Sequence, residues 1–500
     1  MDYSGLQNGS DIRGVAMEGI AGQSVNLGEQ ACRDIGRGFA VWLKERLQKD
    51  ALRVAIGRDS RLSGPALSGW IGEALAAEGI AVTDMGMAST PAMFMATVTE
   101  GFLFDASVMI TASHLPYNRN GFKFFTREGG LEKQDIKAIL TLAASDRHTG
   151  LPAADRTVGS FMPVYAGILC RKVREATGLE RPLEGLRIVV DAGNGAGGFY
   201  AADVLEPLGA DTTGSRFLDP DGTFPNHIPN PENEAAMAAI TEAVVQNKAD
   251  LGIIFDTDVD RAGAVLSDGS ELNRNRIIAM MAAILLREHP GTTIVTDSIT
   301  STGLSAFITA HGGVHLRFKR GYRNVINESI RLNAEGHDSQ LAMETSGHGA
   351  LKENYFLDDG AYLVTRLLIE LSKARREGYT LPSLIADLKE PAESREFRMN
   401  LLLPDFRSYG NDIIEKLHGF VAAQPGWTPA SDNYEGVRVN LDANHGNGWF
   451  LLRMSLHDPL MPLNIESDSA GGVKTIAREL LPFLAQFDQL DTTALADFIR

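Results

Sequence analysis

The sequence predicts an α/β protein of several domains, and three observations lead to this prediction. Short runs rich in β-branched residues alternate with Ala- and Leu-rich stretches of helical periodicity. This alternation restarts along the chain, and the C-terminal part has a different pattern of elements, with shorter predicted strands and longer loops. The length of 500 residues is several times that of an ordinary domain. We therefore expect three similar α/β domains and a smaller C-terminal α+β domain.

The predicted strands are apolar runs that end in small or polar residues. They are LRVAIGRD (52–59), LRIVVDAGNG (186–195), LGIIFDTD (251–258) and TIVTDS (293–298). GPALSGWIGEALAAEG (64–79) and ENEAAMAAITEAVVQNKA (232–249) have the spacing and helix propensity of helices. Alternating strands and helices form mostly parallel sheets, so we expect functional loops at the carboxyl ends of the strands.

The restarts of this rhythm predict where the domains begin and end. A second α/β unit begins near RPLEGLRIVV, a third near DGSELNRNRII, and the texture changes after KEPAESREFRMN. The predicted domains are I (1–160), II (161–267), III (268–395) and IV (396–500).

Composition excludes several classes of function. The chain has 47 Lys+Arg against 64 Asp+Glu, a formal net charge of -17, which argues against general nucleic-acid binding. The two cysteines, Cys32 and Cys170, lie far apart, which argues against a disulfide framework or a cysteine-rich zinc site. The N-terminus resembles no signal peptide, and the most apolar run (277–286) is too short to span a bilayer. We expect a cytoplasmic monomer or dimer with no membrane or nucleic-acid partner.

The first segment that carries chemistry is TASHLPYNRNGFKFF (111–125). Ser113 lies in a polar loop directly after the apolar run ASVMI. A serine hydroxyl is a weak nucleophile that needs a base, a lowered pKa or a metal. Its neighbours Ala112 and His114 exclude the G-x-S-x-G elbow of α/β hydrolases. A loop serine that only makes a turn hydrogen bond remains the alternative.

The second segment, LGIIFDTDVDRAG (251–263), has a carboxylate at every second position after a predicted buried strand. The residues are Asp256, Asp258 and Asp260. Such concentrated negative charge is costly unless a cation neutralises it, and oxygen ligands suit Mg²⁺. An EF-hand is excluded because Arg261 and Ser267 replace the required Gly and Glu. The segment predicts a Mg²⁺ site with a phosphate as further ligand, and a solvated acidic turn is the alternative.

Two further loops carry groups that could bind a sugar phosphate. AMETSGHGA (342–350) contains Glu344, Ser346 and His348, which suit the recognition of sugar hydroxyls. RMSLHDP (453–459) places Arg453 and Ser455 after an apolar strand, where the guanidinium could bind phosphate oxygens. Taken alone, each pattern is also typical of an ordinary surface turn.

One glycine pattern has two interpretations. DAGNGAGG (191–198) matches G-x-G-x-x-G through Gly193, Gly195 and Gly198, the pattern of a dinucleotide-binding turn. The acidic residue expected after it is present only loosely, at Asp211 or Asp219. Small residues at a tight turn explain the glycines as well, and we favour that interpretation.

Taken together, these segments resemble the α-D-phosphohexomutase family, which includes phosphoglucomutase, phosphomannomutase and phosphoglucosamine mutase. TASH-x-P followed by NG-x-K looks like its phosphoserine loop, D-x-D-x-DR its metal loop, E-x-SGH its sugar loop and R-x-S its phosphate loop. The family order is kept, and the resemblance extends to SDIRG, AIGRDSRLSG and DGTFPNHIPNPE. It implies a four-domain enzyme with one such loop per domain facing a central cleft.

The resemblance also implies an activity. A phosphosugar mutase, an isomerase that acts as an intramolecular phosphotransferase, would interconvert hexose 1-phosphate and hexose 6-phosphate of glucose, mannose or both. Phospho-Ser113 would give its phosphoryl group to the substrate, and a hexose 1,6-bisphosphate intermediate would return the other phosphate. Mg²⁺ would bind Ser113 and the three aspartates, with hexose 1,6-bisphosphate as activator. A phosphoglucosamine mutase, a hexose-bisphosphate synthase and a non-catalytic phosphosugar-binding paralogue are the alternatives.

The resemblance suggests roles for the remaining site residues. Arg13, Arg261 and Lys123 would stabilise the charge of the moving phosphoryl group. Lys123 and His348 are the candidates for proton transfer at the sugar hydroxyl, whereas His114 would orient the serine loop. The expected substrate-binding residues are Glu344, Ser346, Gly321, Arg453 and Ser455.

Some positions depart from the family pattern. Leu115 stands where the serine loop usually has Asn, and Thr345 matches none of the common choices in the sugar loop. The phosphate loop has Leu456, His457 and Asp458 where R-P-S-G-T-E-P has Gly, Thr and Glu. A bulky residue in place of glycine hinders close approach of the backbone to a phosphate, so we expect this loop to bind phosphate differently.

Overall fold

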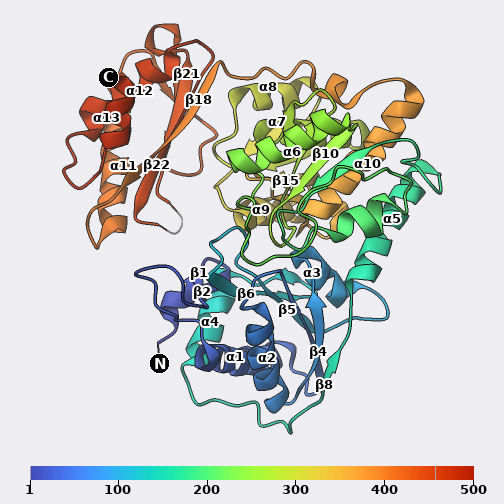
Figure 1. Ribbon diagram of the computed structural model, residues 1–500. Helices are drawn as coiled ribbons and strands as arrows, with labels where there is room; N and C mark the ends of the chain where they lie inside the picture. The colour runs from blue at the N-terminus through green and yellow to red at the C-terminus, as the bar shows by residue number, and fades with distance from the viewer. Residues whose placement is uncertain (1, 456–457) are drawn as a thin grey trace. The chain divides into compact units, whose positions relative to one another are not determined.

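A computed structural model describes residues 2–455 and 458–500 (Figure 1). The chain divides into two compact units. The first contains Met1–Ile277 and Ser346–Ser383, and the second contains Ile278–Thr345 and Leu384–Arg500. Among the described residues, no helix is long and apolar enough to cross a membrane.

The N-terminal part of the first unit is built on one eight-stranded sheet. The strand order is β1-β2-β6-β5-β3-β4-β8, and the short β7 pairs with β6. The strands are β1 Gln7–Asn8, β2 Asp11–Val15, β3 Leu52–Arg58, β4 Ile80–Met87, β5 Ala106–Ile110, β6 Arg119–Thr126, β7 Gly129–Gly130 and β8 Arg156–Val158. β3 is parallel to both β4 and β5, so the loops after β3 and β5 leave the sheet at the same edge.

Helices cover both faces of this sheet because its central strands are apolar on both sides. The helices are α1 Glu29–Leu47, α2 Gly64–Ala77, α3 Thr90–Val98 and α4 Lys133–Ala143. Val54 and Ile56 of β3 belong to the core formed with α1, α2 and α4. At Gly57 the side-chain position faces the opposite side of the sheet. A Cβ there would lie 2.4 Å from the sulfur of Met93 on α3. The absent side chain lets α3 lie close to the strand.

A second sheet, β12-β11-β10-β9, completes the first unit. Its strands are β9 Ile188–Asp191, β10 Leu251–Phe255, β11 Ala262–Leu266 and β12 Glu271–Leu272, and its helices are α5 Met162–Thr177, α6 Glu234–Asn247 and α10 Gly360–Glu377. A π-helical turn spans Tyr200–Leu205. β10 is parallel to β9 and antiparallel to β11, so the chain turns back directly after β10. The hairpin β16 Gly349–Leu351 and β17 Leu357–Asp358 lies in the same unit.

The second unit begins within α7 Arg274–Glu288 and first forms a parallel sheet, β14-β13-β15. Its strands are β13 Thr293–Thr296, β14 Val314–Arg317 and β15 Ser339–Met343, with helices α8 Thr302–Ala310 and α9 Tyr322–Ala334. The predicted apolar run 277–286 lies inside α7 and is buried.

The C-terminal part of the second unit is an antiparallel sheet, β18-β22-β21-β20-β19, with helices on it. The strands are β18 Glu393–Asn400, β19 Trp427–Pro429, β20 Val437–Leu441, β21 Gly448–Leu452 and β22 Leu460–Ser467, and the helices are α11 Phe406–Ala422, α12 Gly472–Leu484 and α13 Thr493–Ile499. Alternate strand residues such as Val437, Val439 and Leu441 face one core with α11 and α12. The predicted C-terminal α+β architecture is confirmed.

The predicted strands and helices are present where the sequence placed them. LRVAIGRD, LRIVVDAGNG, LGIIFDTD and TIVTDS contain β3, β9, β10 and β13, and the two predicted helices are α2 and α6. The aspartate segment lies between two paired strands, β10 and β11, so the exclusion of an EF-hand is also confirmed.

The glycines of DAGNGAGG are required by packing. A Cβ on Gly195 would lie 2.6 Å from the backbone oxygen of Thr257, between the first two aspartates, and one on Gly198 would lie 2.2 Å from that of Leu218. Gly193 has φ of +52°. These close backbone approaches account for the glycine pattern, as the tight-turn interpretation expects. The approach of Gly195 to Thr257 also packs this segment against the aspartate loop.

We expect Gly198→Ala to destabilise the protein by about 1–3 kcal/mol, because its methyl group would overlap a backbone oxygen that cannot move aside. Gly167→Ala is the control. Gly167 lies exposed within α5 with open space at its Cβ, so alanine there should stabilise by about 0.5–1 kcal/mol. Urea unfolding of both variants would measure this difference, and equal stabilities would contradict the packing explanation.

Candidate functional site

Ser113 lies in the loop between β5 and β6 in an unusual backbone conformation. Its φ is +49°, in the left-handed region that non-glycine residues rarely adopt. The residue is buried, and its backbone N–H donates a 2.9 Å hydrogen bond to Thr111 Oγ1. Such a conformation persists only where the surroundings hold it.

The strongest such support comes from the fully buried Arg61, which follows β3. Its Nη1 donates to the backbone oxygens of Pro116 and Arg119 at 2.8 and 3.0 Å. Its Nη2 donates to those of Ser113 and, at 2.6 Å, Leu115. One guanidinium therefore binds four carbonyl oxygens of the serine loop.

Asp59 is the buried partner of this arginine. Its carboxylate pairs with Arg61 Nε at 3.3 Å and accepts the Arg61 backbone N–H at 2.9 Å. Burial raises the pKa of Asp59 to about 6, against the opposing effect of Arg61. The sequence assigned neither residue a role, although both lie in the AIGRDSRLSG segment that supported the family resemblance. The sequence signal that could have identified them is the cluster of charged residues, Arg58, Asp59 and Arg61, at the end of a predicted apolar strand.

The three predicted aspartates lie in the tight connection between β10 and β11. Asp256 Oδ2 accepts a 2.9 Å hydrogen bond from Ser113 Oγ, and Asp258 Oδ2 accepts one of 2.5 Å from Thr90 Oγ1. Asp256, Asp258 and Asp260 each offer an oxygen within 4.8 Å of the others, and all three are buried. The structure thus places Ser113 against the aspartate loop.

The donor set fits a divalent cation that prefers oxygen ligands. Among the described residues, Asp258 Oδ1 and Asp260 Oδ1 are buried with no hydrogen-bond partner. Burial, and then repulsion from the neighbouring carboxylates, raises the pKa values of Asp256 and Asp258. A bound cation would remove this repulsion and use the free oxygens.

Three cationic side chains face the serine and the aspartates. Arg261 Nη2 donates to Ser113 Oγ at 2.8 Å, and its Nε lies 3.3 Å from Asp256. Lys123 Nζ lies 3.3 Å from Asp260 and 3.2 Å from Asp11.

The third cation, Arg13, lies beside Lys123 because its strand β2 pairs with β6. Arg13 binds Asp11 at 2.8 Å and donates to the backbone oxygen of Thr111 at 2.5 Å. Asp11 therefore contacts two predicted site residues, and no sequence motif had suggested a role for it.

His114 is held beside Arg261 by a hydrogen bond from the guanidinium to its Nδ1. Burial, followed by the positive charge of Arg261, lowers the pKa of His114 to about 2. The imidazole is therefore neutral, which agrees with an orienting role and not with a proton donor.

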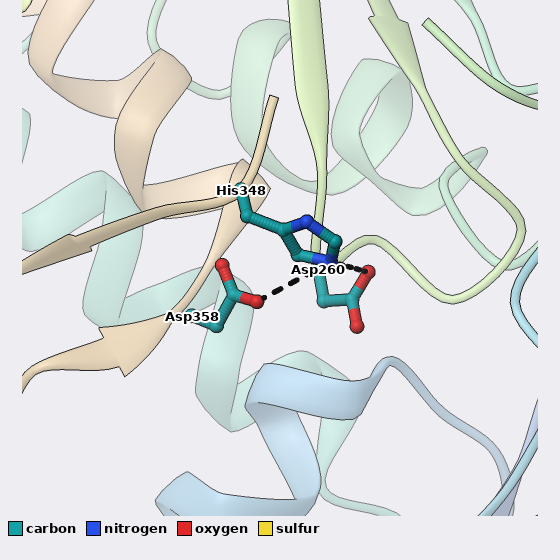
Figure 2. Close-up of side chains that lie close together, drawn as sticks. All are labelled: Asp260, His348 and Asp358. Atoms are coloured by element: carbon teal, nitrogen blue, oxygen red, sulfur yellow. Dashed lines mark ion pairs between the residues drawn. The ribbon is translucent and has the colours of Figure 1, made fainter. Parts of the chain in front are cut away.

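His348 projects toward two carboxylates, as Figure 2 shows. Its Nε2 lies 3.7 Å from Asp260 Oδ1 and 3.5 Å from Asp358 Oδ2, while its Nδ1 lies 2.8 Å from Ser346 Oγ. A backbone bridge between Arg261 and His348 brings the histidine to the aspartate loop. Asp358, on the adjacent strand β17, was not predicted, and these three side chains also have spacings suited to a cation.

The predicted substrate residues of the second unit form a separate group. Glu344, at the end of β15, accepts the Gly321 backbone N–H at 2.6 Å. Gly321 precedes α9 with φ of +115°, a conformation that favours glycine. Thr345 Oγ1 donates to the buried Asp297 at 2.9 Å. The segment with Glu344 and the turn with Gly321 are thus joined by a hydrogen bond.

Arg453 follows β21 and is buried, with Nη1 3.2 Å from the Met454 backbone oxygen. Ser455 Oγ accepts the Asp458 backbone N–H at 3.2 Å. The departures at Leu456 and His457 lie outside the described residues.

Fold and site together define a multidomain α/β protein with a buried serine among aspartates and arginines at the ends of its strands. The chain matches the phosphoglucomutase/phosphomannomutase alpha/beta/alpha domains I, II and III over residues 5–149, 172–269 and 273–390. It belongs to the phosphoglucomutase/phosphomannomutase family.

Individual relatives cover nearly the whole chain. It is 32% identical to a phosphoglucomutase of Neisseria gonorrhoeae, over 92% of this chain and 93% of the relative. It is 30% identical to a phosphomannomutase/phosphoglucomutase of Pseudomonas aeruginosa, over 94% of each. A crystal structure of a phosphoglucomutase/phosphomannomutase family protein from Burkholderia thailandensis covers 96% of each chain with a TM-score of 0.77 and 28% identity.

We expect Arg61→Met to destabilise the protein by about 3–5 kcal/mol, because Asp59 and four carbonyl oxygens lose their buried partner. Arg58→Met is the control, since among the described residues the Arg58 side chain makes no hydrogen bond. Guanidinium-chloride unfolding would compare the two, and equal losses would show that Arg61 does not hold the loop.

We expect Asp258→Asn to raise the unfolding free energy in chelator at pH 8 by about 1–3 kcal/mol, because it removes one of three buried, mutually repelling charges. The folded-state pKa of Asp258 is raised above its ordinary 3.8, so its charge costs stability as pH rises. The gain should therefore shrink as the pH falls from 8 toward the ordinary pKa of 3.8. Denaturation with and without Mg²⁺ tests this, and saturating Mg²⁺ should favour the parent protein. A less stable variant in chelator at pH 8 would contradict the expectation.

Proposed function

We propose that this protein is a phosphosugar mutase that interconverts hexose 1-phosphate and hexose 6-phosphate of glucose, mannose or both, with Ser113 as the phosphoryl carrier. The observation that carries the proposal is the setting of the Ser113 hydroxyl, 2.9 Å from Asp256 Oδ2 and 2.8 Å from Arg261 Nη2. A hydroxyl held between a carboxylate and a guanidinium can accept a phosphoryl group and have its negative charge stabilised.

In the first transfer, the bond between Ser113 Oγ and phosphorus breaks while a sugar hydroxyl oxygen bonds to phosphorus. The product is a hexose 1,6-bisphosphate and a free serine. In the second transfer, the phosphate at the other end returns to Ser113. In the first step one sugar hydroxyl loses its proton and Ser113 Oγ gains one. In the second step Ser113 Oγ loses its proton and the sugar oxygen at the other end gains one, so nearby groups must accept and return protons.

Lys123 and His348 are our candidates for this proton transfer. Each lies beside Asp260, with Lys123 Nζ at 3.3 Å and His348 Nε2 at 3.7 Å, so both belong to the cluster around the serine. His114 is unsuited because its neutral ring accepts a hydrogen bond from Arg261. Arg13 and Arg261 cannot exchange protons at neutral pH and would act through their charge.

Asp256, Asp258 and Asp260 would hold Mg²⁺, which would neutralise negative charge on the phosphoryl group. The buried oxygens of Asp258 and Asp260 that accept no hydrogen bond support this assignment.

We further propose that Glu344 and Ser346 bind the sugar hydroxyls, beside Gly321. Arg453 and Ser455 would bind the phosphate that is not being transferred. The Gly321–Glu344 hydrogen bond supports the first assignment, and the burial of Arg453 supports the second. The division into domains at residues 160, 267 and 395, the cytoplasmic location and the monomeric or dimeric state stay predictions.

Other activities of the same family would use the same residues. A phosphoglucosamine mutase would prefer glucosamine 1-phosphate, and a hexose-bisphosphate synthase would accumulate bisphosphate from an activated phosphoryl donor. A non-catalytic paralogue is disfavoured by the complete serine, aspartate and arginine cluster.

A coupled assay with glucose, mannose and glucosamine 1-phosphates, Mg²⁺ and a hexose bisphosphate would test the function. We expect turnover of glucose or mannose 1-phosphate and a phosphorylated fraction in the intact-mass spectrum. Ser113→Ala should abolish both, whereas Ser267→Ala, at an exposed turn after β11, should change neither. Absence of turnover with all three sugars would refute the mutase assignment, and full activity of Ser113→Ala would refute the phosphoserine mechanism.

A further inference from the structure

We infer that Thr90, the first residue of α3, is a positioning residue that orients Asp258 for cation binding and fixes the aspartate loop against the sheet that carries Ser113. No sequence motif and no part of the family resemblance suggested a role for it. The identity of the cation as Mg²⁺ rests on the proposed function, whereas the hydrogen bonds of Thr90 do not depend on it.

Thr90 binds Asp258 through two hydrogen bonds. Its Oγ1 donates one of 2.5 Å to Asp258 Oδ2, and its backbone N–H donates one of 2.8 Å to the Asp258 backbone oxygen. The two residues are 3% and 0% exposed, so water cannot replace a hydrogen bond that is lost there. One residue of α3 therefore fixes both the backbone and the carboxylate of Asp258.

The Thr90 hydroxyl also distinguishes the two carboxylate oxygens of Asp258. Asp258 Oδ2 accepts the hydrogen bond from Thr90, whereas Asp258 Oδ1 is buried and accepts none among the described residues. Groups that hydrogen-bond to a metal-binding carboxylate orient it, and their removal typically weakens metal binding by about 10–100-fold. Thr90 therefore holds the carboxylate with Oδ1 available as the ligand oxygen.

The helix that begins with Thr90 is itself attached to the sheet of the serine loop. Ser107 on β5 donates a buried hydrogen bond of 2.6 Å to the backbone oxygen of Met93 on α3. Gly57 on β3 lets the same Met93 approach the sheet closely. Because Ser113 follows β5 directly, Thr90 has a fixed position relative to the serine, and it transmits that position to the aspartate loop.

Another link between the serine loop and the aspartate loop is Ser113 itself, whose Oγ donates a hydrogen bond to Asp256 Oδ2. A phosphorylated serine oxygen has no proton to donate, so this hydrogen bond is absent from the phosphoserine form that the proposed function requires. The Thr90 hydroxyl keeps its proton in both forms. Thr90 therefore holds the aspartate loop whether the phosphoryl group is on the serine or on the sugar.

The test compares two kinds of substitution at Thr90. Thr90→Val replaces the hydroxyl with a methyl group of similar size, and Thr90→Ala removes the hydroxyl without placing a methyl group against the carboxylate. Thr90→Ser keeps the hydroxyl. Thr97→Val is the matched control, because Thr97 is fully buried in the same helix and its hydroxyl donates to the Phe94 backbone oxygen at 2.7 Å.

Mg²⁺ binding to each full-length protein is measured by isothermal titration calorimetry after removal of metal with a chelator, and circular dichroism checks that each is folded. We expect Thr90→Val and Thr90→Ala to weaken Mg²⁺ binding at least fivefold, and Thr90→Ser and Thr97→Val to stay within twofold of the parent. In turnover, the Mg²⁺ concentration that gives half-maximal activity of Thr90→Val should rise in the same proportion. The KM for the sugar phosphate should stay within twofold.

The binding measurement separates this inference from the proposed function. If no sugar phosphate is turned over but the Mg²⁺ affinities follow the expected order, the mutase assignment fails and the role of Thr90 stands. If the parent turns over a sugar phosphate but the folded Thr90→Val and Thr90→Ala proteins bind Mg²⁺ within fivefold of the parent, the inference is wrong and the mutase assignment stands. The inference is also wrong if Thr97→Val or Thr90→Ser loses as much affinity as Thr90→Val.

Discussion

The first unit depends on the burial of three carboxylates beside a serine. Asp256, Asp258 and Asp260 are almost completely removed from water, and burial and mutual repulsion raise the pKa values of the first two. Charges in such a place must be compensated nearby. Arg261 and Lys123 supply part of that compensation, and the oxygens of Asp258 and Asp260 that accept no hydrogen bond are available for a cation to supply the rest.

The same constraint explains the architecture around the serine. β5 and β10 end at the serine loop and at the aspartates, and β3 ends at the arginine that holds the serine loop. The loop has a strained left-handed serine, and Arg61 fixes it through four carbonyl oxygens. The side chains of a functional site must keep their geometry, and a buried support that makes several hydrogen bonds provides that rigidity.

The second unit presents the opposite charge. Its buried Arg453 makes no ion pair among the described residues, and burial lowers the pKa of its guanidinium although Glu435 and Glu396 partly offset this effect. A buried cation that makes no ion pair lowers the stability of the free protein, and an anion that binds there recovers part of that free energy. The acidic overall charge of -17 is therefore no obstacle to phosphate binding, because local burial decides the electrostatics of each site.

The sequence by itself determined the elements and the chemistry that follows them directly. Apolar β-branched runs predicted β3, β9, β10 and β13, because the pattern of a buried strand is local. The aspartates at alternate positions after β10 predicted a cation site for the same reason. The glycines of DAGNGAGG predicted a tight turn, although only the structure identified Thr257 and Leu218 as the backbone they approach.

The tertiary structure alone decided which side chains meet. Asp11 contacts Arg13 and Lys123, Arg61 binds carbonyl oxygens more than fifty residues away, and Asp358 reaches His348 across a hairpin. These contacts depend on which strands are neighbours and on the direction of each side chain. The local periodicity of the sequence contains no information about either.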